Sequence, residues 1–319
     1  AASRWSVRVA GWQMSARGSA RPTYDQGFAL STGTPLASSA GIDAPPGASL
    51  IVIRPREGLF ELDLMGVWRY RELLYFLVWR DLKVRYAQAA LGAIWAIVQP
   101  LFTVLIFTAV FGVFAKVPSE GMPYAVFAFA AVLPWTYFSE AARRSALGLV
   151  GDANLVRKIY FPRLIIPLAN VLSPLVDFAV SFLVFLGVML WYGVAPTWNL
   201  LMVVPLLIVT MGLSLSIGLW LGPINVRFRD IQHTIPFLLQ VWMYLAPIVY
   251  PLSIVPERWR TLYSLNPMVG VIEGFRWALL GKGSVDLFAL GVSVAFIVVT
   301  LAAGLVFFRH HERTFSDVI

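Results

Sequence analysis

The sequence of 319 residues is 59% hydrophobic and only 13% charged, and it contains no cysteine. Soluble domains carry about 45–50% apolar and about 25% charged residues, so this composition excludes a cytosolic globular enzyme. The lack of cysteine excludes disulfides, thiolate zinc sites and cysteine nucleophiles, and three histidines leave little for a metal centre. A formal charge of +8 on so apolar a chain indicates basic loops against an anionic membrane face and no nucleic-acid partner.

The N-terminal part of the chain precedes the apolar stretches. Residues 1–50 are rich in Ala, Ser, Gly, Thr and Pro and contain no apolar run of signal-peptide length, so we expect a disordered extension. Residues 51–91 are expected to form a cytoplasmic segment with a helix over 66–88. That helix has one stripe of large apolar side chains beside Arg69, Glu72, Arg80 and Lys83: Trp68, Tyr75, Trp79, Leu82 and Tyr86. This pattern favours an amphipathic interfacial helix, with an ordinary packed helix as the alternative.

Six apolar stretches follow. A helix needs about 20 mostly apolar residues to cross the hydrocarbon core. Five stretches meet that length, and one is shorter because Glu140, Arg143 and Arg144 interrupt it, so its helix is expected to project beyond the bilayer. The predicted spans are 92–115, 124–146, 164–192, 198–224, 235–255 and 285–308. The sequence therefore predicts an all-α polytopic membrane protein with a six-span domain over 92–308 and a cytoplasmic tail over 309–319.

The basic residues predict the orientation of these spans. Cytoplasmic loops collect Lys and Arg. Of the 25 lysine and arginine residues, 20 lie in segments on the same side as the two termini. We therefore expect both termini in the cytoplasm.

Residues 256–281 are too polar to span the membrane and too apolar for a free external loop. The Asn266–Pro267 pair is expected to divide this segment into two short helices. Glu273 and Arg276 lie three residues apart on the second helix, where they can pair at membrane depth. The prediction is a re-entrant helical hairpin that enters from the outer face between spans five and six.

Four segments resemble the membrane subunits of ABC exporters for polysaccharides, the type 2 permease family. They are YRELLYFLVWRDLKVRYAQAALGAIWAIVQPL at 70–101, LVRKIYFPRLIIPL at 155–168, NVRFRDI at 225–231 and NPMVGVIEGFRWALLG at 266–281. That family exports lipid-linked O-antigen, capsule and teichoic-acid chains. The resemblance implies a homodimer in the bacterial inner membrane, with each copy docked on a cytoplasmic ATPase subunit.

The chain has no phosphate-binding loop of the form G-x-x-x-x-G-K-[ST]. ATP and Mg are therefore expected on the partner subunit, with no cofactor, metal or catalytic residue in this chain. The resemblance places the ATPase contact on the loop between spans two and three, at Arg157, Lys158, Tyr160 and Phe161, and on a shorter one at Arg227, Arg229 and Asp230. The alternative is that these loops are basic only because they are cytoplasmic.

Three basic residues follow the aromatic stripe, at the level where a polyprenyl diphosphate head group first meets the protein. Arg80, Lys83 and Arg85 suit phosphate oxygens, although ordinary anionic lipids would suit them equally.

A glycan path needs surfaces that bind sugar rings weakly and repeatedly, and aromatic faces do this. The candidates are Trp135, Tyr137, Phe138, Trp242, Tyr244 and Tyr250, in spans two and five. Each of them could equally belong to an interface belt or to the core.

Two acidic residues inside predicted spans need an explanation, because a charge at membrane depth is costly. These are Glu140 and Asp177. We expect a structural role for Asp177, either protonated or bonded to Asn170 or to a carbonyl freed by Pro174.

The predicted function is the membrane-spanning subunit of an ATP-driven exporter of lipid-linked polysaccharide. One alternative is a type 2 ABC permease for a drug or a lipid. The other is a polyprenyl-linked membrane transferase, which would need clustered carboxylates or histidines in loops that are here short and poor in them.

Overall fold

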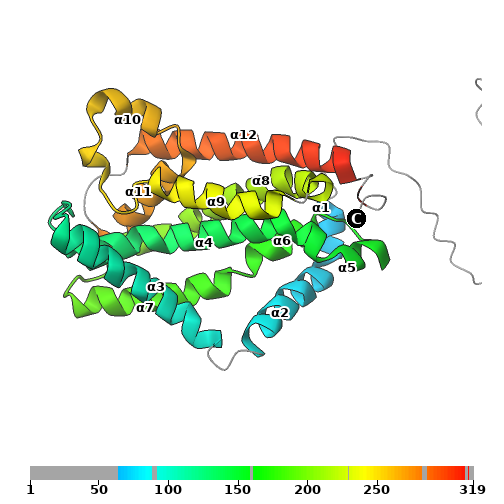
Figure 1. Cartoon of the computed structure of the whole chain (residues 1–319), viewed down its shortest axis with the longest axis horizontal. Coiled ribbons are helices and arrows are strands. Elements are labelled where there is room, and N and C mark those ends of the chain that lie inside the picture. The colour runs from blue at the N-terminus through cyan, green and yellow to red at the C-terminus, as the bar shows by residue number, and fades with distance from the viewer. Residues whose placement is uncertain are drawn as a thin grey trace, which may run out of the picture. The chain divides into compact units, whose positions relative to one another are not determined.

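The computed structural model describes residues 64–87, 92–158, 161–228, 230–281, 286–312 and 315. Every regular element within these ranges is helical (Figure 1). The described residues all belong to one compact unit, Glu57–Ile319. The predicted disordered extension over 1–50 lies outside the described residues.

Five helical segments in the described part of the chain are long and apolar enough to cross a membrane. Three of them combine two helices: α3 (Gly92–Phe107) with the π-helix η1 (Thr108–Phe114), α6 (Ile165–Leu172) with α7 (Leu175–Trp191), and the 3-10 helix η2 (Trp198–Met202) with α8 (Val203–Arg227). The other two are α4 (Tyr124–Gly151) and α12 (Leu287–Glu312). They match predicted spans one, two, three, four and six, as expected for a polytopic membrane protein.

The predicted fifth span differs from the others. Over 235–255 the chain forms only α9 (Ile231–Tyr244), a helix of 14 residues, followed by turns and the 3-10 helix η3 (Leu252–Ile254). At the usual helical rise α9 is about 21 Å long, against about 30 Å for a hydrocarbon core. Pro247 explains the early end, because proline lacks an N–H donor and its ring clashes with the preceding helical turn. The helix thus covers only part of the predicted span over 235–255, and a crossing at this place stays a prediction.

α4 forms the centre of the bundle. It packs against α8, α6, α11, α7 and α3, and most of its side chains are buried. Figure 1 shows α4 running between α12 and α8 on one side and α3 and α7 on the other. Small residues permit the close approach of α4 and α8: a Cβ added to Gly218 would lie 2.5 Å from Cβ of Ser145.

The helix predicted over 66–88 forms two helices, α1 (Leu64–Arg69) and α2 (Arg71–Ala87), and α2 packs against α6. Leu77 of α2 is buried with Ile165 and Ile166. Trp68, Tyr75 and Trp79 remain exposed. One side of α2 thus packs on the bundle while its large aromatic side chains stay exposed, and the interfacial position stays a prediction.

The segment over 256–281 forms two helices, α10 (Glu257–Tyr263) and α11 (Pro267–Leu280). The predicted break at Asn266 and Pro267 is confirmed. Pro267 is the first residue of α11, and the Asn266 side chain caps the helix by accepting a hydrogen bond from the backbone N–H of Met268. α11 packs against α4, α12 and α8, so it belongs to the core of the bundle.

Candidate functional site

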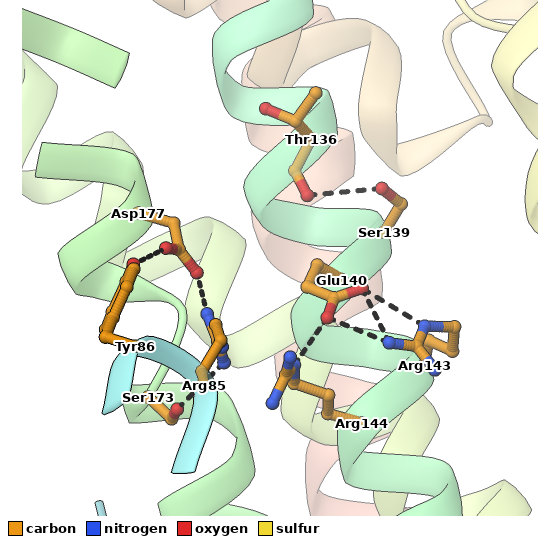
Figure 2. Close-up of polar contacts among 9 residues, drawn as sticks. All are labelled: Arg85, Tyr86, Thr136, Ser139, Glu140, Arg143, Arg144, Ser173 and Asp177. Atoms are coloured by element: carbon orange, nitrogen blue, oxygen red, sulfur yellow. Dashed lines mark hydrogen bonds and ion pairs between the residues drawn. The ribbon is translucent and has the colours of Figure 1, made fainter. Parts of the chain in front are cut away.

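A group of charged and polar side chains lies where α2 meets α4, α6 and α7 (Figure 2). We call it the arginine cluster. Figure 2 shows Arg85 and Arg144 between two carboxylates, those of Asp177 and Glu140. Its members are Arg85 and Tyr86 from α2, Glu140, Arg143 and Arg144 from α4, Ser173 at the end of α6 and Asp177 in the first turn of α7.

Asp177 is held by α2. The guanidinium of Arg85 forms an ion pair with one carboxylate oxygen of Asp177 and donates a hydrogen bond of 3.2 Å to the Ser173 hydroxyl. The Tyr86 hydroxyl donates to the other oxygen of Asp177. Asp177 is thus not bonded to Asn170 as expected: its partners are Arg85 and Tyr86, which lie 92 and 91 residues earlier in the sequence. The Asn170 amide instead donates to the Ile166 carbonyl.

Glu140 is paired within its own helix. Arg143 donates to its two oxygens at 2.8 Å and 2.9 Å through Nη2 and at 3.1 Å through Nε. Arg144 approaches the same carboxylate from the next position along the helix. Residues three and four apart share one helix face, so α4 alone brings these three charges together.

The arginine cluster contains three guanidinium groups and two carboxylates. The exposed fractions of the five charged side chains lie between 22% and 38%. Burial lowers the pKa of the Arg85 guanidinium, and the nearby charge of Arg144 lowers it further. The cluster is thus partly accessible from outside the chain.

A second ion pair connects α2 to the end of α4. Arg80 contacts Asp152 at 2.9 Å and its neighbour Asp81 at 2.8 Å. Asp152 follows the last residue of α4 and directly precedes α5 (Ala153–Lys158). Burial raises the pKa of the Asp152 carboxyl, and Arg80 opposes that shift. Of the three residues predicted to meet a lipid head group, Arg80 and Arg85 therefore have separate carboxylate partners, and Lys83 is exposed.

The residues predicted to contact an ATPase occupy different environments. Arg157 and Lys158 are exposed at the end of α5, and Arg227 and Asp230 are exposed between α8 and α9. Phe161 is buried among apolar side chains, so it supports the loop from inside. Tyr160 and Arg229 lie outside the described residues.

The predicted glycan-path aromatics also divide into two groups. Trp135, Tyr137 and Phe138 are buried in the core. Trp242 of α9 packs edge-on against Trp135 and Phe138, with ring centroids 6.5 Å and 5.2 Å apart. Tyr244 is exposed, and the Tyr250 hydroxyl lies 2.7 Å from that of Tyr263.

A pocket opens between α9, α10 and the start of α11, with a volume of about 500 Å³. We call it the aromatic pocket. The Trp242 indole donates to the Asn266 side-chain oxygen at 2.9 Å, and the Asn266 amide donates to the Leu245 carbonyl at 3.0 Å. Sequence reasoning identified Trp242 and Asn266 but missed Trp259 and Tyr263, whose spacing of four residues on α10 was the available signal. The lining residues are Trp242, Leu245, Trp259, Leu262, Tyr263, Asn266 and Pro267.

The pair predicted between Glu273 and Arg276 is confirmed, with an N···O distance of 2.8 Å. Arg276 is only 5% exposed. Its guanidinium also donates to the carbonyls of Ile248 and Tyr250 and lies 3.8 Å from the ring centroid of Phe127. Arg276 therefore holds the turn that follows α9, next to the aromatic pocket.

Known proteins are similar in sequence to this chain over most of its length. Residues 72–280 match the family described as ABC-2 type transporter. The O-antigen export system permease protein RfbA of Myxococcus xanthus is 31% identical over 255 residues, which are 79% of this chain and 97% of that protein. A protein of the same name from Klebsiella pneumoniae is 24% identical, covering 78% of this chain and 95% of its own length. The polysialic acid transport protein KpsM of Escherichia coli is 27% identical, covering 73% and 91%.

Proposed function

Because the chain belongs to the ABC-2 type transporter family, we propose that it is the membrane-spanning subunit of an ATP-driven polysaccharide exporter. Its substrate would be a polyprenyl-diphosphate-linked glycan, moved from the cytoplasmic to the outer side of the bacterial inner membrane. The observation that carries this proposal is the match to export subunits for O-antigen and polysialic acid over nearly their whole length. The chain is then a transport subunit, with ATP hydrolysis on a separate partner.

Contacts between loops support a topology with an even number of crossings. Arg80, before the first span, pairs with Asp152 after α4. The backbone N–H of Arg163, in that same loop, donates to the Glu312 carboxylate at the end of α12. Segments in contact must share one side of a membrane, so the chain before the first span and the end of the last span lie together. Five crossings would put these two segments on opposite sides of the membrane. A sixth crossing is therefore needed, and α9 is the helix that would supply it.

A contact between the outer loops leads to the same number of membrane crossings. The Ser253 hydroxyl, after α9, donates to the Glu120 carboxylate in the loop after η1. One crossing precedes Glu120, so an odd number of crossings must precede Ser253. Four long segments precede α9, and a crossing by α9 makes the number five. In this topology α10 and α11 form a re-entrant hairpin on the outer side, and both termini are cytoplasmic.

Labelling of single cysteines tests this topology cleanly, because the chain contains none of its own. We expect a membrane-impermeant maleimide to label Lys116→Cys and Ser253→Cys from outside intact cells. Arg157→Cys should react only after the membrane is opened. Labelling of Ser253→Cys only from the inside would contradict a crossing by α9.

The partner surfaces follow from this orientation. The exposed Arg157 and Lys158 of α5 would face an ATPase subunit on the cytoplasmic side, together with the exposed Arg227 and Asp230. A homodimer would cover part of the exposed apolar face of α9, which includes Phe237, Leu238 and Val241. Exposed apolar faces on a membrane protein are otherwise covered by lipid.

The aromatic pocket suits a sugar ring on the outer part of the path. Trp242, Trp259 and Tyr263 offer ring faces to the apolar C–H face of a pyranose, and Asn266 adds a polar group. Trp135 and Phe138 would support Trp242 from behind, while Tyr244 and Tyr250 extend the aromatic surface. Such contacts bind weakly without fixing one hydroxyl pattern, as a moving chain of sugars needs.

Deletion of the gene in its native bacterium tests the proposed function. We expect surface polysaccharide to be lost and lipid-linked glycan to accumulate inside the cell. The matched control is an inactive ATPase subunit, which should reproduce both effects. Normal surface polysaccharide with no accumulated glycan would contradict the proposal, and accumulation of another lipid or a drug would indicate a different substrate.

A further inference from the structure

The end of α12 contacts the segment that joins α5 to α6. The backbone N–H of Arg163 in this segment donates to the side-chain carboxylate of Glu312 at 3.1 Å, and the Arg163 guanidinium donates to the backbone carbonyl of Glu312. The same guanidinium lies 5.7 Å from the ring centroid of Phe315. Figure 1 shows the end of α12 at the same end of the bundle as α5. Arg163 and Glu312, which are 149 residues apart in the sequence, are thus joined by two hydrogen bonds.

Phe315 is buried beside the same segment. Its side chain is 1% exposed, and its ring packs edge-on against Phe308 of α12, with ring centroids 5.5 Å apart. The ring belongs to the apolar cluster that contains Val156 of α5, Phe161 and, from α2, Leu77. Burial of an aromatic ring removes a large apolar area from water. Phe315 therefore fixes the chain that follows α12 to the loop around α5.

α5 depends on such contacts because it has only six residues. An isolated helix shorter than about 12–15 residues is marginal in water, so contacts with the rest of the fold must hold α5 in place. Val156 is its buried residue. Arg80 of α2 fixes the start of α5 through Asp152, and Glu312 and Phe315 fix the chain beyond its end. The short helix is thus held on both sides.

We propose that Glu312 and Phe315 are positioning residues for the coupling of ATP hydrolysis to transport. They hold the loop that presents the exposed Arg157 and Lys158, so that a movement of the ATPase subunit is passed on to α12 and α2. A loop without these contacts would move by itself, and hydrolysis would continue with less transport. This inference rests on the proposed function, because it takes α5 as the contact with the ATPase subunit.

The first measurement is amide hydrogen exchange over residues 153–163 in the full chain, in nanodiscs without the ATPase subunit. Phe315→Ala removes a buried ring and Glu312→Ala removes the acceptor of the Arg163 N–H, so exchange should be about tenfold faster in each. Phe315→Leu keeps an apolar side chain and Glu312→Gln keeps an acceptor, and both should stay close to the wild-type rate. The matched control is Phe185→Ala, which removes a ring buried in the other apolar cluster and should not change exchange over 153–163.

The second measurement is the number of ATP molecules hydrolysed per glycan transported by the complex in proteoliposomes. Phe315→Ala and Glu312→Ala should raise this ratio severalfold, and Phe315→Leu and Glu312→Gln should restore it. Phe185→Ala should lower the melting temperature and leave the ratio unchanged. The ratio therefore separates a role in coupling from a general loss of stability.

Unchanged exchange over 153–163 in both alanine variants would overturn the proposed contact between the end of α12 and the loop. Faster exchange with an unchanged ratio would show that the contact only stabilises the loop, and would overturn its role in coupling. The two variants remove different contacts, so one of them still tests the proposal if the other fails to fold. A wild-type complex that transports no glycan would remove the proposed function and the role in coupling with it, whereas failure in the variants alone leaves the proposed function intact.

Discussion

The chain carries charge in two regions near opposite ends of α4, and the two regions are built differently. In the outer region Arg276 is almost fully buried and is held by one carboxylate, two backbone carbonyls and the ring of Phe127. In the arginine cluster every charged side chain is partly exposed, and the ion-pair partners are side chains, on one helix for Glu140 and on two helices for Asp177. Backbone carbonyls cannot move away from Arg276, but carboxylates can rotate away from Arg85 and Arg144. The outer charge is therefore held by more groups, and in a more buried place, than any charge of the arginine cluster.

The largest effect is expected from breaking the outer region. Arg276→Met leaves Glu273 without its ion-pair partner and two carbonyls without a donor, so the free energy of unfolding should fall by about 3–5 kcal/mol. The double change Glu273→Gln with Arg276→Met should recover only part of this, because the carbonyls of Ile248 and Tyr250 still lack a donor. Thermal unfolding in detergent measures both.

The control for this change is Arg258→Met, which removes an exposed arginine from α10 in the same hairpin. It should alter stability by less than about 0.5 kcal/mol. If Arg276→Met were as mild as the control, the outer charge would be in water and the hairpin would not be buried.

The next effect concerns the scaffold that connects the two regions. Gly218→Ala places a Cβ 1.8 Å from Oγ and 2.5 Å from Cβ of Ser145, so α8 and α4 must separate. Overpacking of this kind costs about 1–3 kcal/mol. Gly187→Ala in α7 is the matched control, since nothing lies within 4 Å of its added Cβ, and it should be neutral or slightly stabilising. Equal melting temperatures for the two variants would contradict the close α4–α8 contact.

The smallest effect on stability is expected at the cytoplasmic surface. Arg157→Glu with Lys158→Glu changes two exposed side chains of α5, so the free energy of unfolding should change by less than about 0.5 kcal/mol. ATP-dependent transport should nevertheless fall sharply if, as proposed, these charges face the ATPase subunit. Co-purification with that subunit and transport are measured together, and normal values for both would mean that the loop is basic only because it is cytoplasmic.

Local sequence patterns predicted the features that depend on near neighbours. Five of the six spans predicted from apolar stretches match long apolar helical segments, Pro267 predicted the break between the two short helices, and a spacing of three predicted the Glu273–Arg276 pair. Each depends on residues within one or two helical turns of each other.

Features that depend on tertiary packing were not predictable in this way. The partner of Asp177 is Arg85, 92 residues earlier, and no local spacing indicates it. The apolar composition over 235–255 suggested a span of that length, but the helix ends at Tyr244, three residues before Pro247. Phe161 was predicted to contact the ATPase together with Arg157 and Lys158. It is instead buried in the apolar cluster that contains Ile165, a position that depends on tertiary packing.

Transport in reconstituted vesicles tests the central claim most directly. The chain and its ATPase subunit are placed in proteoliposomes with a polyprenyl-diphosphate-linked glycan in the leaflet that faces the ATPase. We predict that ATP makes the glycan accessible to a glycan-cleaving enzyme on the opposite side, and that the chain without its ATPase subunit does not. Glycan that stays protected in the complete system with ATP would contradict the assignment of this chain as a polysaccharide exporter subunit.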